Sequence, residues 1–94
     1  MNSHSTSFQL GSTIHVEVLD RHSLAVYDET MNTTQIIDAS FHWLLALLTF
    51  PTSYSEIKNS FITVYDETPS GEISEQLDEL LNTFLQNKLI NKVD

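Results

Sequence analysis

One segment near the middle of the chain is apolar on almost every side. Residues 41–50 read FHWLLALLTF, and only one histidine and one threonine interrupt the run. A helix that crosses a membrane needs about 20 apolar residues in succession, so this run is too short to span one. A helix that is apolar all round has to be buried among the other elements of a domain. We therefore predict a central helix over about residues 39–50, with Asp38 as its N-cap and Pro51 after its end.

The residues before this helix supply a layer for it to pack against. Residues 13–19 alternate apolar and polar side chains, as a half-buried strand does. Residues 24–27 form a second short apolar run, and residues 33–37 are β-branched at four of five positions, which favours a strand. Short polar turns join the three runs, and Asn32 suits a left-handed turn position. We predict a three-stranded antiparallel meander.

Two further helices are predicted after the central one. Ser53 and Glu56 have the spacing of a capping box and precede a helix over about residues 54–65. Residues 73–85 form an amphipathic helix, whose apolar stripe comprises Ile73, Leu77, Leu80, Leu81, Phe84 and Leu85. The Leu-Ile pair at residues 89–90 is expected to fold back onto the core. The predicted fold class is α+β, with a three-stranded antiparallel sheet followed by three helices.

The 94 residues are enough for one compact domain and too few for two with separate cores. Residues 1–12 are rich in serine, threonine and asparagine, and we expect a flexible N-terminal tail there, in which Phe8 or Leu10 could contact the domain. Residues 13–94 are predicted to form the single domain. The N-terminus has no secretory signal pattern and the chain has no cysteine, so a cytoplasmic location is expected.

The chain is strongly acidic. Thirteen Asp and Glu residues face four Lys and Arg residues, which gives a net charge of −9. Binding to a phosphate backbone depends on clustered Lys and Arg, so a nucleic-acid partner is disfavoured. The same charge favours basic partners. Several of the acids, Glu72, Glu75, Asp78 and Glu79, lie on the last predicted helix, where we interpret them as a solvated face that could steer such a partner.

No catalytic residue, metal ligand or cofactor site is predicted. The four histidines are His4, His15, His22 and His42, and no two have the helical spacing of a zinc-binding pair. No serine stands in a Gly-x-Ser-x-Gly turn, and two glycines cannot build a phosphate-binding loop. We therefore expect that the protein is not an enzyme.

The pentapeptide VYDET occurs twice, at residues 26–30 and 64–68. The residues before the first copy alternate like a strand, whereas those before the second have helical spacing. A structural repeat would need matching flanks over 20 or more residues. We interpret the repeat as coincidence and expect one domain without internal symmetry.

The predicted order of elements carries a set of short sequences in a characteristic order. They are Ala25–Asp28, Thr34–Asp38, Phe41–Leu48, Ser55–Ile57, Val64–Asp66 and Leu77–Ile90. This pattern resembles the PqqD family, small winged-helix-like domains that are also called RiPP precursor peptide recognition elements. The resemblance covers roughly residues 13–91. Within the family the chain is similar to the branch found beside HPr-kinase-like proteins, but Met31-Asn32-Thr33-Thr34 stands where that branch has Gly-Asp-Thr-His.

The resemblance implies a peptide chaperone without catalytic activity. Such domains capture the leader segment of a precursor peptide and present it to a modifying enzyme, here of the radical SAM or kinase-like class. The peptide adds as a strand to the edge of the third strand and lies against the last helix. The predicted peptide-binding residues are Thr33, Thr34, Gln35, Ile36 and Ile37 on the strand and Gln76, Leu80, Thr83 and Phe84 on the helix.

Two other classes of protein share this pattern of elements. A winged-helix transcription regulator would need a basic recognition helix, but residues 54–65 contain Lys58 as their only basic residue. A dimerisation domain would pair sheet edges between two copies, so both a monomer and a homodimer remain open. A sheet edge without a blocking charge is also often covered by a loop, a tail or a second copy.

Overall fold

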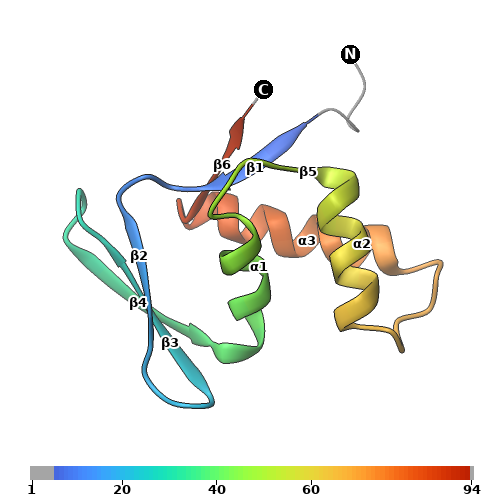
Figure 1. Cartoon of the computed structure of the whole chain (residues 1–94), viewed down its shortest axis with the longest axis horizontal. Coiled ribbons are helices and arrows are strands. Elements are labelled where there is room, and N and C mark those ends of the chain that lie inside the picture. Colours follow the sequence, from blue (N-terminus) through green and yellow to red (C-terminus); the bar gives the residue numbers. More distant parts are fainter. Residues whose placement is uncertain (1–5, 94) are drawn as a thin grey trace.

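The computed structural model describes residues 6–93, which form an α+β fold with two three-stranded antiparallel sheets (Figure 1). One sheet has the order β2–β3–β4, with β2 at Ile14–Val18, β3 at Ser23–Asp28 and β4 at Thr33–Asp38. The other has the order β5–β1–β6, with β1 at Ser7–Leu10, β5 at Thr52–Ser53 and β6 at Ile90–Val93. The helical elements are the 3-10 turn η2 (Ala39–Phe41), α1 (His42–Leu47), α2 (Tyr54–Val64) and α3 (Ile73–Gln86).

The predicted meander is confirmed as β2, β3 and β4. Val26 in the middle strand lies opposite Val16 on one side and Gln35 on the other. Because side chains alternate along a strand, Leu24 and Val26 share one face of the sheet, and both are buried. Asn32 adopts the predicted left-handed conformation, with φ at 52°, and its side chain accepts a hydrogen bond from the Tyr27 hydroxyl at 2.9 Å.

The central helix is shorter than predicted. The prediction of one helix over residues 39–50 is wrong, because the segment divides into η2 and the six-residue α1. Asp38 caps the first turn as expected, with its carboxylate accepting the N–H of Ser40 at 2.8 Å. The helix stops at Leu47 because Pro51, four residues later, has no N–H to donate to the Leu47 carbonyl. The next carbonyl, that of Leu48, accepts the N–H of Leu10 in β1 at 2.7 Å.

The α1 segment nevertheless has the buried position that its apolar sequence predicts. Leu44, Leu45 and Leu48 are fully buried, and α1 lies between the β2–β3–β4 sheet and α2 (Figure 1). Each buried leucine contributes about 1.5–3 kcal/mol through the hydrophobic effect. Phe50 lies beyond the helix and is 75% exposed. Within residues 6–93, neither α1 nor any other helix has the length and apolar character needed to cross a membrane.

The two later helices match their predicted ranges closely. Ser53 caps α2, because its hydroxyl accepts the N–H of Glu56 at 3.3 Å and donates to the Glu56 carboxylate at 3.0 Å. In α3 the buried stripe comprises Leu77, Leu81 and Phe84. The Tyr54 hydroxyl donates to the Asp78 carboxylate at 2.7 Å and so joins the start of α2 to α3.

The N-terminal segment differs from the prediction. Residues 7–10, expected within a flexible tail, form β1 at the centre of a sheet, and Phe8 is buried. The pairing runs from Ser7 opposite Val93 to Leu10 opposite Ile90, so the partner strand comes from the far end of the sequence. No local pattern reveals such a distant partner. Residues 1–5, the rest of the predicted tail, lie outside the described part of the chain.

The chain after α3 folds back onto the core as predicted, but it also forms the unpredicted strand β6. Leu89 and Ile90 are both buried. The reversal uses a Schellman motif, in which the N–H of Leu89 donates to the carbonyl of Phe84 at 3.0 Å. This motif holds Lys88 in the left-handed conformation, with φ at 61°. A side chain with a Cβ is strained there, because the Cβ approaches the backbone.

Replacing Lys88 with glycine should therefore raise the free energy of unfolding. Glycine has no Cβ, so it relieves the strain of the left-handed conformation, but it also loses more backbone entropy on folding than lysine does. The net gain in the free energy of unfolding should be about 1 kcal/mol. Urea denaturation followed by circular dichroism would measure it. The matched control is Asn87→Gly, at a neighbouring position with φ at −81°, which should lower stability. An unchanged or lower stability of Lys88→Gly would contradict the assigned strain.

The contact between α2 and α3 should be sensitive to alkaline pH. Burial, together with the hydrogen bond to Asp78, raises the pKa of Tyr54 from 10.0 to about 12. The folded state therefore favours the neutral phenol, so the stabilisation is complete below pH 10 and is lost as the pH rises from 10 to about 12. An ultraviolet titration of phenolate absorbance should show one tyrosine that ionises last. Tyr54→Phe should remove that phase and Tyr27→Phe should leave it in place; the opposite pattern would contradict the assignment.

Candidate functional site

The strand β4 forms an open edge of its sheet. It pairs with β3 alone, and the N–H of Ala39, just after it, donates to the carbonyl of His22 at 2.9 Å. Main-chain groups alternate between the two sides of an antiparallel strand. Odd-numbered residues of β4 therefore face β3, whereas Thr34 and Ile36 face the open side. Within residues 6–93 the N–H and C=O groups of these two residues have no main-chain partner, so they can pair with another strand.

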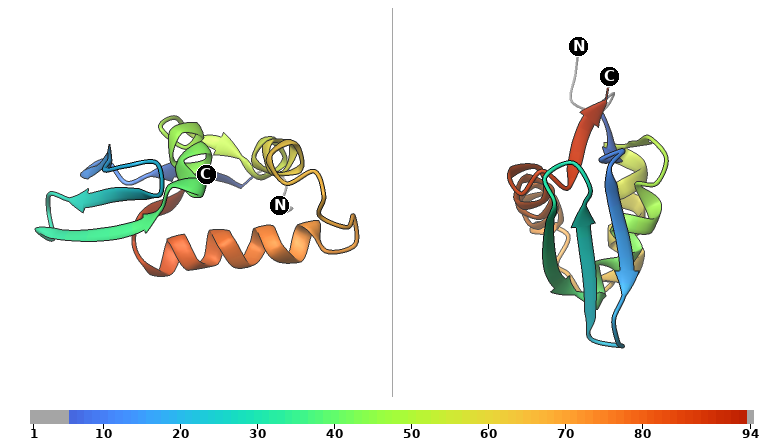
Figure 2. Two further views of the ribbon diagram at one scale, coloured as in Figure 1. Left: turned by 90° about the horizontal axis from the view of Figure 1, so that it is seen from below. Right: turned by 90° about the vertical axis from the view of Figure 1, so that its left-hand side faces the viewer.

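The C-terminal end of α3 lies near β4, and the rest of the helix extends away from the β2–β3–β4 sheet (Figure 2). A groove of about 450 Å³ lies between α3 and Phe41, the last residue of η2, and we call it the α3 groove. Phe84 and Phe41 form its apolar floor, with their ring centroids 5.7 Å apart and their planes at 79°. Leu80 is half-buried beside them, while the remaining lining residues are exposed. The lining residues are Phe41, Gln76, Glu79, Leu80, Thr83 and Phe84.

One side-chain hydrogen bond joins β4 directly to the end of α3. The Gln35 amide donates to the carbonyl of Asn87 at 3.4 Å. Gln35 lies on the inner face of the sheet, opposite the buried Val26. This bond lies just after the C-terminal end of α3, beyond the helix residues 76–84 that line the α3 groove.

The structure brings the predicted helix residues together. Gln76, Leu80, Thr83 and Phe84 all line the α3 groove. The predicted strand, residues 33–37, is the open-edge strand β4, but it does not line this groove. Ile36 is 61% exposed at the edge, whereas Ile37 packs against the core.

The sequence-based site did not include Phe41 and Glu79. Glu79 lies three residues after Gln76 and four before Thr83, so helical periodicity alone could have placed it on the same face. Phe41 was assigned to the core helix, and its place in the groove depends on η2, which ends the strand and turns this ring toward α3.

The acidic groups near the α3 groove are exposed. Glu79 lines the groove itself, and Asp38 ends β4 beside η2. Hydrogen bonds from Ser40, chiefly from its backbone N–H, lower the pKa of the Asp38 carboxyl below its usual 3.8. Asp38 is therefore negatively charged at neutral pH.

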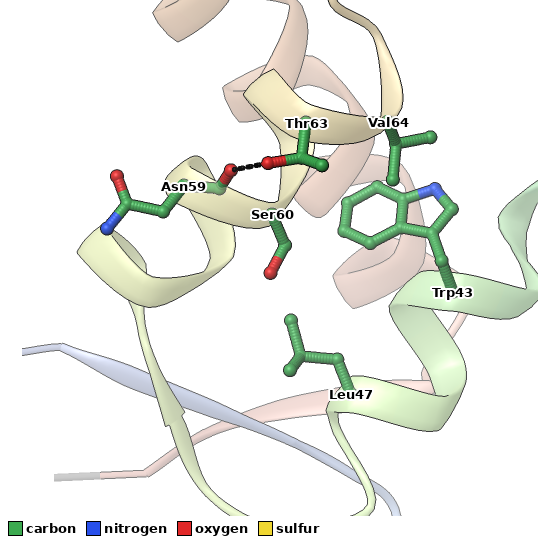
Figure 3. A pocket seen from close by; sticks show the side chains of 6 residues that line it. All are labelled: Trp43, Leu47, Asn59, Ser60, Thr63 and Val64. Atoms are coloured by element: carbon green, nitrogen blue, oxygen red, sulfur yellow. Dashed lines mark hydrogen bonds between the residues drawn. The ribbon is translucent and has the colours of Figure 1, made fainter.

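A second groove lies between α1 and α2 (Figure 3). It measures about 390 Å³, and its lining residues are Trp43, Leu47, Asn59, Ser60, Thr63 and Val64. The Trp43 indole donates to the Tyr65 hydroxyl at 3.1 Å, and the Thr63 hydroxyl donates to the carbonyl of Asn59 at 3.1 Å. No lining residue is charged and no strand edge borders the groove, so it offers fewer means of recognising a ligand than the α3 groove.

The described residues hold no group of three or more His, Cys, Asp and Glu side chains that could bind a metal ion. His15 and Glu29 form an exposed pair at 2.9 Å, and His22 and His42 are exposed. His4 lies outside the described residues. Within residues 6–93 every buried side-chain nitrogen or oxygen has a hydrogen-bond partner.

Comparison of the chain with models of protein families, with curated proteins and with solved structures found no match. The resemblance to the PqqD family stays a prediction. The open edge of β4 and the α3 groove are the structural features that bear on function.

Proposed function

We propose that this protein is a non-catalytic peptide-binding module of the PqqD type. It captures the leader segment of a precursor peptide by strand addition at β4 and presents it to a modifying enzyme. The observation that supports this proposal best is the open edge of β4, with the α3 groove at its end. A strand edge binds the main chain of a guest, and pockets beside it select the guest's side chains.

The free energy of capture comes from two sources. Thr34 and Ile36 each offer one N–H and one C=O group, and each hydrogen bond made there contributes about 0.5–1.5 kcal/mol. These bonds must offset the entropy lost when the peptide becomes ordered. Burial of one large apolar side chain against Phe41 and Phe84 adds about 1.5–3 kcal/mol. The main chain therefore supplies the pairing, and the groove supplies the selectivity.

The proposed function also includes partners and a location in the cell. The partners are the leader peptide and a modifying enzyme of the radical SAM or kinase-like class, in the cytoplasm and without a cofactor. The net charge of −9 argues against a nucleic-acid partner, because phosphate groups would be repelled.

A second candidate function is dimerisation through the same edge. The exposed Ile36 at the open edge of β4 favours it, because a second copy can pair with this edge as a peptide can. Light scattering at several protein concentrations separates the two candidates, since a stable dimer through β4 would leave no free edge for a peptide.

An amide-shift titration of the full chain with the precursor peptide encoded nearby should perturb residues 33–37 of β4 and residues 76–84 of α3. Ile36→Pro should abolish capture, because it deletes an N–H that faces the open edge while leaving the β3–β4 hydrogen bonds in place. The matched control is Val18→Pro, which deletes an outward-facing N–H on the other edge strand, β2, and should leave capture intact.

Circular dichroism would establish that both proline variants are folded. If Ile36→Pro fails to fold, Thr83→Lys provides a second test, because Thr83 is exposed and lines the α3 groove. Shifts confined to other surfaces, or binding by Ile36→Pro and Thr83→Lys that equals wild-type binding, would show that strand addition at β4 is wrong.

A further inference from the structure

The charge that lines the α3 groove is negative only. Glu79 is its only ionisable lining residue, and no lysine or arginine lines it. The four basic residues of the chain lie elsewhere: Arg21 before β3, Lys58 in α2, Lys88 beyond α3 and Lys92 in β6. The only ion pair among residues 6–93 joins His15 and Glu29, so no cationic side chain neutralises Glu79.

The acidic character extends beyond the groove along the same helix. Glu75 lies four residues before Glu79, and Glu72 lies four residues before Gln76. Because residues four apart share one side of a helix, these two acids continue the groove-facing side toward the start of α3. Asp38 adds a carboxylate at the end of β4. A guest strand that follows β4 toward η2 therefore passes from the apolar floor of the groove toward a negative surface.

The spacing of these features matches the repeat of a strand. Phe84 and Leu80 are four residues apart on α3, a rise of about 6 Å, and Leu80 and Gln76 are separated by the same rise. Side chains two residues apart on one face of a strand are separated by about 6.8 Å. A guest side chain over Phe84 and Leu80 therefore has its next same-face neighbour near Gln76 and Glu79.

From this geometry, and on the basis of the proposed function, we infer the chemistry of the captured peptide. We propose that it is an extended segment with a large apolar side chain that enters the α3 groove and a lysine or arginine two positions away that pairs with Glu79. The apolar side chain is buried against Phe41 and Phe84. The cation meets an unpaired carboxylate, and an acid at the same position would be repelled. The net charge of −9 would also speed association with such a peptide at low salt.

A phage-displayed library of random linear peptides, selected on the immobilised full chain, tests this inference. The enriched peptides should share a large apolar residue with lysine or arginine two positions away, and Ile36→Pro should remove their enrichment. Fluorescence anisotropy with one enriched synthetic peptide should then show that Glu79→Lys weakens binding by about three- to tenfold, because an exposed attraction becomes a repulsion.

The matched control is Glu17→Lys, an exposed position on β2 with the same change in net charge, and it should weaken binding less than Glu79→Lys does. Equal weakening by both variants would overturn the pairing with Glu79 and leave only an effect of net charge. Ile36-dependent peptides with acidic or neutral residues in place of the cation would overturn the inference and leave the proposed function standing. If no Ile36-dependent peptide is enriched, both the inference and the proposed function are wrong.

Discussion

The burial of Leu44, Leu45 and Leu48 is the interaction on which the rest of the structure depends. These side chains hold α1 between the β2–β3–β4 sheet and the other helices (Figure 1). Because η2 joins β4 to α1 without a loop, the position of α1 fixes the end of β4. It also fixes Phe41, whose ring packs on Phe84 of α3. The packing of α1 in the core therefore sets the position of the α3 groove relative to the open edge of β4.

Sequence patterns predict the elements whose causes are local. Three of these patterns involve only neighbouring residues: the alternation in residues 13–19, the cap at Asp38 and the capping box at Ser53. The elements that they predict are present as β2, η2 and α2. The pairing of β1 with β6 joins residues 80 to 86 positions apart, and no property of residues 7–10 alone reveals it. The carbonyl of Leu48, just after α1, likewise has a distant partner, the N–H of Leu10 in β1.

The candidate site divides along similar lines. The face of α3 that lines the groove follows from helical periodicity, so Gln76, Leu80, Thr83 and Phe84 could be grouped from the sequence. Phe41 could not, since its orientation depends on how η2 turns. Glu79 was assigned to the solvated acidic face of the helix. Its place beside an apolar floor emerges only when η2 is packed against α3, and that packing makes its charge relevant to recognition.

The position of β1 has a consequence for how the protein is made. A chain leaves the ribosome N-terminus first, so β1 emerges long before residues 90–93. Closing so long a loop has an entropic cost that local contacts do not carry, and β1–β6 pairing should therefore come late in folding. Until then, the nascent β1 has one unprotected edge and Phe8 lacks its full covering. This interval is when a newly synthesised chain is most exposed to aggregation or to binding by a chaperone.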